Sequence, residues 1–211
     1  MTAVSEFADK LLDAVKERRG LAPLSDTMDL DEATALDVQE AVVQARVDAG
    51  FPIVGAKLGL TSKAKQQQMS VDRPLYGWLT SDMQIDVAVP VVCSDYIQPR
   101  VEPEIAFLLG RDLEGRTVTA AQVLAATEAC FGAIDVLDSR YTGYKFTFND
   151  VTADNASSAG FVLGGTAVDP YGLDLRLTGC VLEKNGELVS TAAGASVMGH
   201  PATAVAWLVR A

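Results

Sequence analysis

The spacing of apolar residues predicts helices in the first part of the chain. From residue 3 to 19, apolar side chains recur every three or four positions, as on the buried face of an amphipathic helix, and Gly20 is a suitable stop. A second helix is expected from an Asp31 cap to about Val47. Residues 1–50 are therefore predicted to form a helical N-terminal region, and the positions of its second helix expected to be buried are Leu36, Val42 and Ala45.

The pattern becomes strand-like after residue 50. The segments 51–60 and 74–79 are rich in apolar, β-branched and aromatic residues bounded by glycine and proline. Residues 173–190 surround Asn185-Gly186, a dipeptide typical of the type I′ turn of a β-hairpin. A sheet-containing region is expected to follow the N-terminal helices.

Two further helices are expected within this later part. Residues 117–130 have helical spacing and a capping residue at Thr119. A last helix is expected to start at Pro201, because proline is favoured at the first helical position. His200 would then be a capping or interface residue rather than a base.

The composition argues against several classes of function. A net charge of −11 over 211 residues argues against nucleic acid or an anionic membrane as partner, since both require a basic surface. No apolar run is long enough to span a bilayer, and the N-terminus lacks a signal-peptide pattern. The three cysteines form no metal motif or disulfide framework, which favours a reducing cytoplasm. With one histidine, the chemistry is expected to depend on carboxylates, lysines and a metal ion.

Two apolar segments carry acids that suggest a metal site. Glu102 and Glu104 alternate within one predicted strand and so share a face, and Asp135 lies in a second apolar run. A divalent cation would relieve the repulsion of such acids, and Mg²⁺ or Mn²⁺ prefers oxygen ligands. The alternative, an exposed edge strand with two solvated glutamates, stays open.

A lysine and two polar segments are the other candidate functional features. Lys57 stands in an apolar segment near glycines, where a partly desolvated ammonium can act as an electrophile or an acid. Residues 138–146 and 153–160 are dense in hydrogen-bonding groups, as functional loops often are. Residues 74–79 could form core or the wall of a pocket.

Five segments carry a combined pattern that is specific. They are Lys57-Leu58-Gly59-Leu60-Thr61-Ser62, residues 99–106, Asp138-Ser139-Arg140, residues 153–157 and Gly199-His200-Pro201. Taken together, these motifs resemble the fumarylacetoacetate hydrolase superfamily, and within it the 2-keto-4-pentenoate hydratase and 4-oxalocrotonate decarboxylase branch. The resemblance covers nearly the whole chain and implies an α+β fold with a mostly β core, a Mg²⁺ or Mn²⁺ ion and homo-oligomers. It also implies a cytoplasmic enzyme of aromatic-compound catabolism.

The resemblance assigns roles to individual residues. Glu102 and Glu104 match metal ligands, and Asp135 falls where the branch usually has glutamate. Lys57 matches a pocket lysine, and Ser157 a serine that contacts the substrate acid group. The other candidates from the matching segments are Leu58, Arg140 and Asn155 as substrate contacts, and Leu75 and Lys145 as catalytic residues.

The resemblance also raises a question about the end of the chain. Family members continue with further core strands after the segment that corresponds to residues 202–211. The expected catalytic core, residues 51–211, would therefore be C-terminally truncated or completed in another way.

Leu75 separates the two activities of the branch. Hydratases have Pro-Asp-Phe/Tyr-Gly where this chain has Pro74-Leu75-Tyr76-Gly77, and leucine cannot activate water. We therefore expect decarboxylation of 4-oxalocrotonate, with hydration of 2-hydroxypenta-2,4-dienoate as the alternative. Two other readings stay open: a non-catalytic partner subunit in a mixed complex with a related hydratase, and hydrolysis of a carbon–carbon bond in a β-diketo acid.

Overall fold

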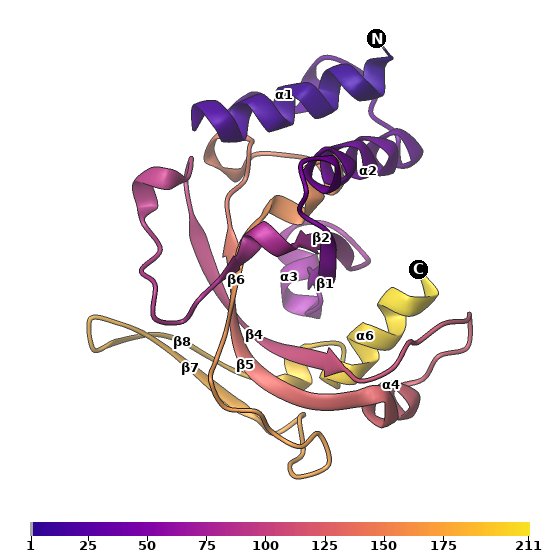
Figure 1. The fold of residues 1–211 in the computed structure, drawn as a ribbon, viewed down its shortest axis with the longest axis vertical. Coiled ribbons are helices and arrows are strands. Elements are labelled where there is room, and N and C mark those ends of the chain that lie inside the picture. Colours follow the sequence, from indigo (N-terminus) through magenta and orange to yellow (C-terminus); the bar gives the residue numbers. More distant parts are fainter. Residues whose placement is uncertain (1) are drawn as a thin grey trace. The chain divides into compact units, whose positions relative to one another are not determined.

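The computed structural model describes residues 2–211 and alternates helices with strands (Figure 1). The first half contains α1 (Ala3–Glu17), α2 (Glu32–Asp48), β1 (Ile53–Gly59), α3 (Lys63–Gln68), β2 (Leu75–Thr80), β3 (Gln84–Ile85) and β4 (Arg100–Leu109). The second half contains α4 (Ala120–Ala126), β5 (Thr127–Leu137), α5 (Phe148–Ala153), β6 (Ser158–Leu163), β7 (Gly179–Lys184), β8 (Glu187–Ala193) and α6 (Pro201–Arg210). The expected mixed fold with a helical N-terminal region is confirmed.

The two N-terminal helices begin and end through local chemistry. The Thr2 side chain accepts a hydrogen bond from Ser5 N, and that of Asp31 accepts one from Thr34 N at 2.8 Å, which satisfies otherwise unpaired amides. The first helix ends earlier than Gly20, because Arg18 already adopts a left-handed conformation with φ of 52°. Both predicted helices are nevertheless confirmed.

The buried face of α2 differs in part from the expected one. Val42 is buried as predicted, whereas Leu36 and Ala45 are only half-buried. Ala35 and Val38 are completely buried instead. The helix α2 contacts both α1 and α5. Its buried face therefore differs from the single apolar stripe expected from the sequence.

Later residues complete the core beneath these helices. Tyr141 is completely buried among apolar side chains of α1 and α2, and its hydroxyl donates to Asp150 O at 3.1 Å. Ala153 of α5 belongs to the same cluster. The segment around residues 138–154 is therefore built into the core rather than lying over the surface as a loop.

The predicted helix at 117–130 is wrong in its second half. Thr119 caps α4 as expected, in a reciprocal capping box with Gln122. The helix ends at Ala126, and Thr127 begins β5, which continues to Leu137. The small and apolar residues after Ala126 are compatible with a helix or a strand. Pairing with neighbouring strands of the sheet favours the strand.

Three sheets are present in the described residues. β1 and β2 form an antiparallel pair, the strand order of the four-stranded sheet is β3-β6-β5-β4, and β7 and β8 form a hairpin. Asn185 and Gly186 have φ of 54° and 80°, so the predicted turn is confirmed, although the first hairpin strand begins at Gly179 rather than near Leu173.

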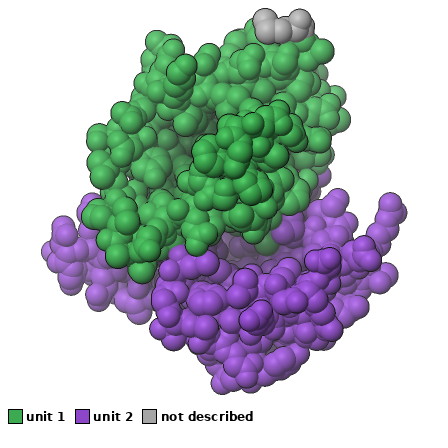
Figure 2. Space-filling model, viewed as in Figure 1, with its two compact units in different colours: residues 1–59, 75–102, 135–162 green, residues 60–74, 103–134, 163–211 purple. Residues whose placement is uncertain are grey.

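The chain divides into two compact units, shown in different colours in Figure 2. Unit 1 comprises residues up to 59, 75–102 and 135–162, and unit 2 comprises 60–74, 103–134 and 163–211. The division falls within β4 and within β5, so each of these strands contributes residues to both units. The sequence-based division at residue 50 stays a prediction.

Unit 2 has its own small core between α4 and α6. Val123 and Ala202 are completely buried there. Pro201 opens α6, and His200 Nδ1 accepts a hydrogen bond from Ala202 N at 3.0 Å, so the capping role predicted for His200 is confirmed. From residue 2 onward, no helix has the length and apolar character needed to cross a membrane.

Candidate active site

The β1–β2 pair determines the position of Lys57. In its antiparallel register Lys57 lies opposite Gly77, Leu58 opposite Tyr76, and Gly59 opposite Leu75. Leu75 is buried, at 6% exposure, and Leu58 is half-buried. Three of the predicted site residues therefore lie within one short two-stranded ribbon.

Lys57 forms a buried ion pair with Asp135 of β5. Each side chain is only 9% exposed. Lys57 Nζ contacts Asp135 Oδ2, but the contact lacks the geometry of a hydrogen bond, and Asp135 Oδ1 is buried without a hydrogen-bond partner. Burial raises the pKa of Asp135, the Lys57 ammonium opposes this, and the Glu102 carboxylate raises the pKa further. An unsatisfied carboxylate oxygen at such a site is suited to a further ligand.

The two glutamates have different environments. Glu102 is half-buried and belongs to unit 1 with Asp135, whereas Glu104 is exposed and belongs to unit 2. Both lie on β4, at the edge of the four-stranded sheet. Within residues 2–211, no three acidic, histidine or cysteine side chains are grouped so that they could hold a metal ion. The three-ligand set stays a prediction.

A strained turn follows α5. Asn155, Ala156 and Ser157 have φ of 49°, 55° and 56°, so three successive non-glycine residues are left-handed. This conformation costs L-residues about 1–2 kcal/mol each and normally occurs singly. All three residues are buried. Backbone strain of this kind is typical of functional sites, where the surrounding structure must maintain it.

Arg140 and Asp154 hold this 155–157 turn. Arg140 Nε pairs with the Asp154 carboxylate, and Nη1 donates to Asp138 O at 2.8 Å and Ser158 O at 3.0 Å. Ser157 Oγ donates to Asp154 Oδ2 at 3.3 Å. Burial raises the pKa of Asp154 to about 6, against the opposing effect of Arg140. Arg140, expected to contact substrate, thus engages the protein itself through most of its guanidinium.

Asn155 also has partners within the protein. Its Nδ2 donates to Trp78 O at 2.9 Å, and its Oδ1 accepts from Trp78 N at 2.7 Å. Lys145, in contrast to the buried Lys57, is exposed. The assignments of Asn155 and Arg140 to substrate, and of Lys145 to catalysis, stay predictions.

Sequence reasoning missed the residues that fix the start of β4. The Asp138 carboxylate accepts hydrogen bonds from Ile97 N at 2.9 Å and Gln98 N at 2.7 Å. Gln98 Nε2 donates to Ser139 O and Tyr141 O, each at 2.7 Å. These contacts fix the chain four residues before Glu102. The sequence signal was the matching Asp138-Ser139-Arg140 motif, from which only Arg140 was selected.

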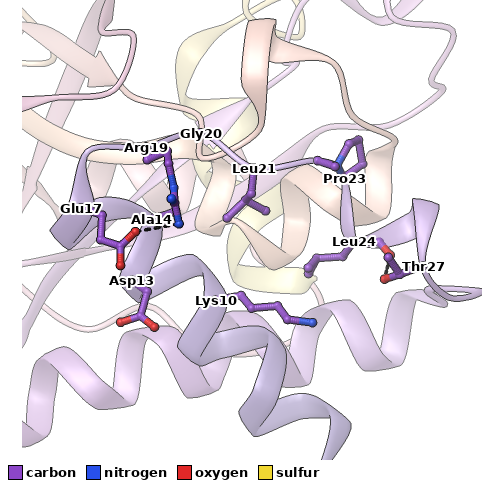
Figure 3. A pocket seen from close by; sticks show the side chains of 11 residues that line it. Lys10, Asp13, Ala14, Glu17, Arg19, Gly20, Leu21, Pro23, Leu24 and Thr27 are labelled. Carbon is purple, nitrogen blue, oxygen red and sulfur yellow. Dashed lines mark hydrogen bonds and ion pairs between the residues drawn. The ribbon is translucent and has the colours of Figure 1, made fainter.

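A separate cavity of about 300 Å³ lies at the end of α1 (Figure 3). Its walls come from α1 and from the segment that leads into residue 27, and an Arg19–Glu17 ion pair of 2.8 Å lies at its margin. The lining residues are Lys10, Asp13, Ala14, Glu17, Arg19, Gly20, Leu21, Ala22, Pro23, Leu24 and Thr27. None of the predicted site residues is among them.

Comparison with known proteins identifies the family, although no family model matches the chain. The sequence is 43% identical over 208 residues to a 2-keto-4-pentenoate hydratase of Paraburkholderia xenovorans (strain LB400), an alignment covering 97% of this chain and 77% of that protein. The chain belongs to the family of 2-keto-4-pentenoate hydratases and 4-oxalocrotonate decarboxylases.

Decarboxylases of this branch are similar to the chain to the same degree. A 4-oxalocrotonate decarboxylase of Pseudomonas sp. (strain CF600) is 44% identical over 184 residues, covering 87% of this chain and 70% of that protein. The solved 4-oxalocrotonate decarboxylase from Pseudomonas putida G7, complexed with magnesium and adipate, is 37% identical with a TM-score of 0.94. That match covers 98% of this chain and 79% of the solved one. The chain is therefore a lyase of this branch.

More distantly related solved structures have a similar fold. A fumarylacetoacetate hydrolase family protein from Yersinia pestis CO92 is 16% identical, with a TM-score of 0.54 over 76% of each chain. At this identity the likeness concerns the fold alone. The branch assignment rests on the closer relatives.

Proposed function

We propose that this chain is a divalent-metal-dependent decarboxylase that converts 4-oxalocrotonate, 2-oxohex-3-enedioate, to 2-hydroxypenta-2,4-dienoate. The observation that carries the proposal is the buried pair of Lys57 and Asp135, in which an ammonium lies beside a carboxylate with one unsatisfied oxygen. A cationic group in a desolvated site stabilises negative charge that develops on an oxygen of the substrate.

One buried carboxylate oxygen is available to a divalent cation. Asp135 Oδ1 is a buried oxygen without a partner, and the pKa of Asp135 is raised by burial and by the nearby Glu102 carboxylate. Asp135, Glu102 and Glu104 would hold the ion, with oxygen ligands of the kind that Mg²⁺ and Mn²⁺ prefer. When bound, the ion would supply Lewis acidity at the 2-oxo acid end of the substrate. The magnesium complex of the similar decarboxylase supports a divalent ion as the cofactor.

The chain's own groups account for the remaining steps. In decarboxylation the bond to the distal carboxyl carbon breaks, CO₂ leaves, and the electron pair moves through the alkene to the 2-oxo oxygen. The Lys57 ammonium would stabilise that developing charge and is a source of the proton that completes the enol. Leu75 is buried and apolar, so it would keep water away from the distal carbon. Ser157 would contact the acid group of the substrate.

Hydration of 2-hydroxypenta-2,4-dienoate is the second candidate function. The observation that favours it is the 43% identity to a hydratase over 97% of this chain, compared with 44% identity to a decarboxylase over 87% of this chain. Hydration requires a group that orients and deprotonates water at the distal carbon. Leu75 cannot serve as that group, which is why we place decarboxylation first.

One assay distinguishes the two functions. The purified protein is incubated with Mg²⁺ and either 2-oxohex-3-enedioate or 2-hydroxypenta-2,4-dienoate, and CO₂ release and water addition are measured separately. We expect CO₂ release from the first compound and slow hydration of the second. Fast hydration without CO₂ release would establish the hydratase function instead.

Metal binding is tested separately by calorimetry with Mn²⁺ and Mg²⁺. Asp135→Asn and Glu104→Gln each remove an anionic oxygen ligand and should weaken binding by at least about tenfold. Glu183→Gln, which changes an exposed glutamate on β7, provides a control of equal charge change. Equal affinities in all the proteins would exclude the proposed ligands.

A further inference from the structure

The outer edge of β2 is paired with side-chain amides. The β1–β2 sheet has two strands, so β2 has backbone groups that β1 does not pair. Asn155 both donates to Trp78 O and accepts from Trp78 N, while Gln39 Nε2 donates to Tyr76 O at 3.0 Å. Both amide side chains are 2% exposed. A primary amide has the donor and acceptor of a peptide group, so Asn155 replaces a neighbouring strand at this point.

Asn155 is itself rigidly held. Its left-handed backbone belongs to the 155–157 turn, and its carbonyl accepts a hydrogen bond from Ser158 Oγ at 2.6 Å. A Cβ added at Gly77 would lie 2.5 Å from this same carbonyl oxygen, so the turn is in direct contact with the backbone of β2. Gly77 is the residue that pairs with Lys57 across the ribbon. A short chain of contacts therefore leads from Asn155 to Lys57.

We propose that Asn155 is a positioning residue, which fixes β2 at Trp78 and thereby holds Lys57 beside Asp135. The proposal deepens the proposed function, on which it rests, because it makes the placement of the Lys57 ammonium depend on the amide of Asn155. Movement of β2 at Gly77 and Trp78 would move the paired residue of β1. An ammonium that must lie beside a developing charge loses effect when it is displaced by about 1 Å.

Two substitutions separate the hydrogen bonds from the backbone conformation. Asn155→Gly removes the amide and suits the left-handed backbone, since glycine adopts positive φ without strain. Asn155→Asp keeps the shape and the acceptor for Trp78 N, but it places a carboxylate oxygen against Trp78 O, where the donor was. Thr119→Ala, which breaks the capping box of α4 in unit 2, is the control for a general loss of stability.

The first experiment measures turnover and the Michaelis constant with 2-oxohex-3-enedioate and Mg²⁺. We expect both Asn155 variants to lose at least about tenfold in kcat with KM changed less than about twofold, while Thr119→Ala keeps its kcat. In a Lys57→Met background, Asn155→Gly should cause no further loss, because its effect acts through Lys57. Additive losses, or a raised KM with unchanged kcat, would overturn the proposal; the latter would make Asn155 a substrate contact.

A second measurement does not depend on activity. The coupling between Lys57 and Asp135 is obtained from urea unfolding of Lys57→Met, Asp135→Asn and the double variant, with Asn155 present and with Asn155→Gly. We expect the coupling to fall by at least about half when the amide is absent, and to stay unchanged in Thr119→Ala. An unchanged coupling would overturn the positioning role even in an active enzyme. Absence of both activities in the parent, together with a reduced coupling, would reject the proposed function alone.

Discussion

Lys57 and Asp135 form an ion pair in which each side chain is 9% exposed and one carboxylate oxygen has no hydrogen-bond partner. Removing one member of a buried pair leaves an uncompensated charge, which typically costs about 3–5 kcal/mol. We predict such a loss of unfolding free energy for Lys57→Met in urea titrations.

Removing both charges should be far less costly. The double variant Lys57→Met/Asp135→Leu replaces the pair with apolar side chains, and we expect it to recover most of the stability lost by Lys57→Met. A double variant that is less stable than either single variant would show that the pair stabilises the fold. Both lysine variants should retain only a small residual decarboxylase activity, since the ammonium is absent.

Leu75→Asp tests the choice between the two activities. Leu75 is buried and packs near Gly59, so a carboxylate there would introduce negative charge and water into the distal part of the site. We expect at least about a tenfold fall in CO₂ release, because the new anion repels the departing carboxylate, with slow hydration of 2-hydroxypenta-2,4-dienoate appearing.

Leu75→Asn is the uncharged control for this substitution. It has a similar shape to aspartate and should reduce decarboxylation less. Circular dichroism verifies that both variants are folded. Equal rates in the two variants would mean that charge at this position does not affect the reaction.

Gly77→Ala tests the close contact between β2 and the 155–157 turn. The added methyl group would lie 2.5 Å from Asn155 O and 2.8 Å from Ser158 Oγ, so the backbone must shift. Overpacking of this kind costs about 1–3 kcal/mol. Gly55→Ala in β1 is the matched control, since its Cβ would lie 4.0 Å from the nearest neighbouring side-chain atom, Leu79 Cδ1. Thermal unfolding should show a large loss for Gly77→Ala and a small change for Gly55→Ala.

Asp150 should make stability depend on acid pH. Burial alone would raise its pKa, but hydrogen bonds from the backbone and side chains of Ser25 and Thr147 outweigh burial and lower the pKa below 3.8. The carboxylate therefore stabilises the fold above the pKa of the unfolded chain, and this contribution is lost as pH falls through the lowered folded pKa.

The variant Asp150→Asn removes this titration. We predict that it is about 2 kcal/mol less stable than the parent at pH 7, the magnitude expected for hydrogen bonds to a charged group. The difference should shrink as the pH falls below 4 in urea titrations at a series of pH values. A difference independent of pH would mean that Asp150 acts through shape alone.

Features decided by neighbouring residues were predictable from the sequence. The Asp31 cap, the Asn185-Gly186 turn and the Pro201 helix start each depend on chemistry within a few residues, and all three are present. Gln66 lies in a run of lysines and glutamines that is typical of an exposed helical face, but it is 4% exposed and donates to Leu60 O at 2.8 Å. The spacing of polar and apolar residues in the sequence does not show which polar side chains the folded structure will bury.

The contacts within the candidate site were not predictable from the sequence. An acid in an apolar run requires a partner, which was the reason to select Asp135, and the partner found in the structure is Lys57. The left-handed backbone at Ala156 could not have been foreseen, because alanine does not favour it and the turn is contacted by residues distant in sequence, among them Gly77 of β2 and Arg140. The conformational preferences of these residues therefore did not predict the strained backbone of the 155–157 turn.

The interleaving of the two units has a consequence for the order of folding. The helices α1 and α2 are made first, but their core includes Tyr141 and Ala153, which follow after two segments that belong to the other unit. During synthesis the apolar surface of these helices that Tyr141 and Ala153 cover must therefore stay exposed until much of the chain has been made. Contacts so distant in sequence slow folding, and the nascent chain is expected to be most prone to aggregation and most dependent on chaperones during this interval.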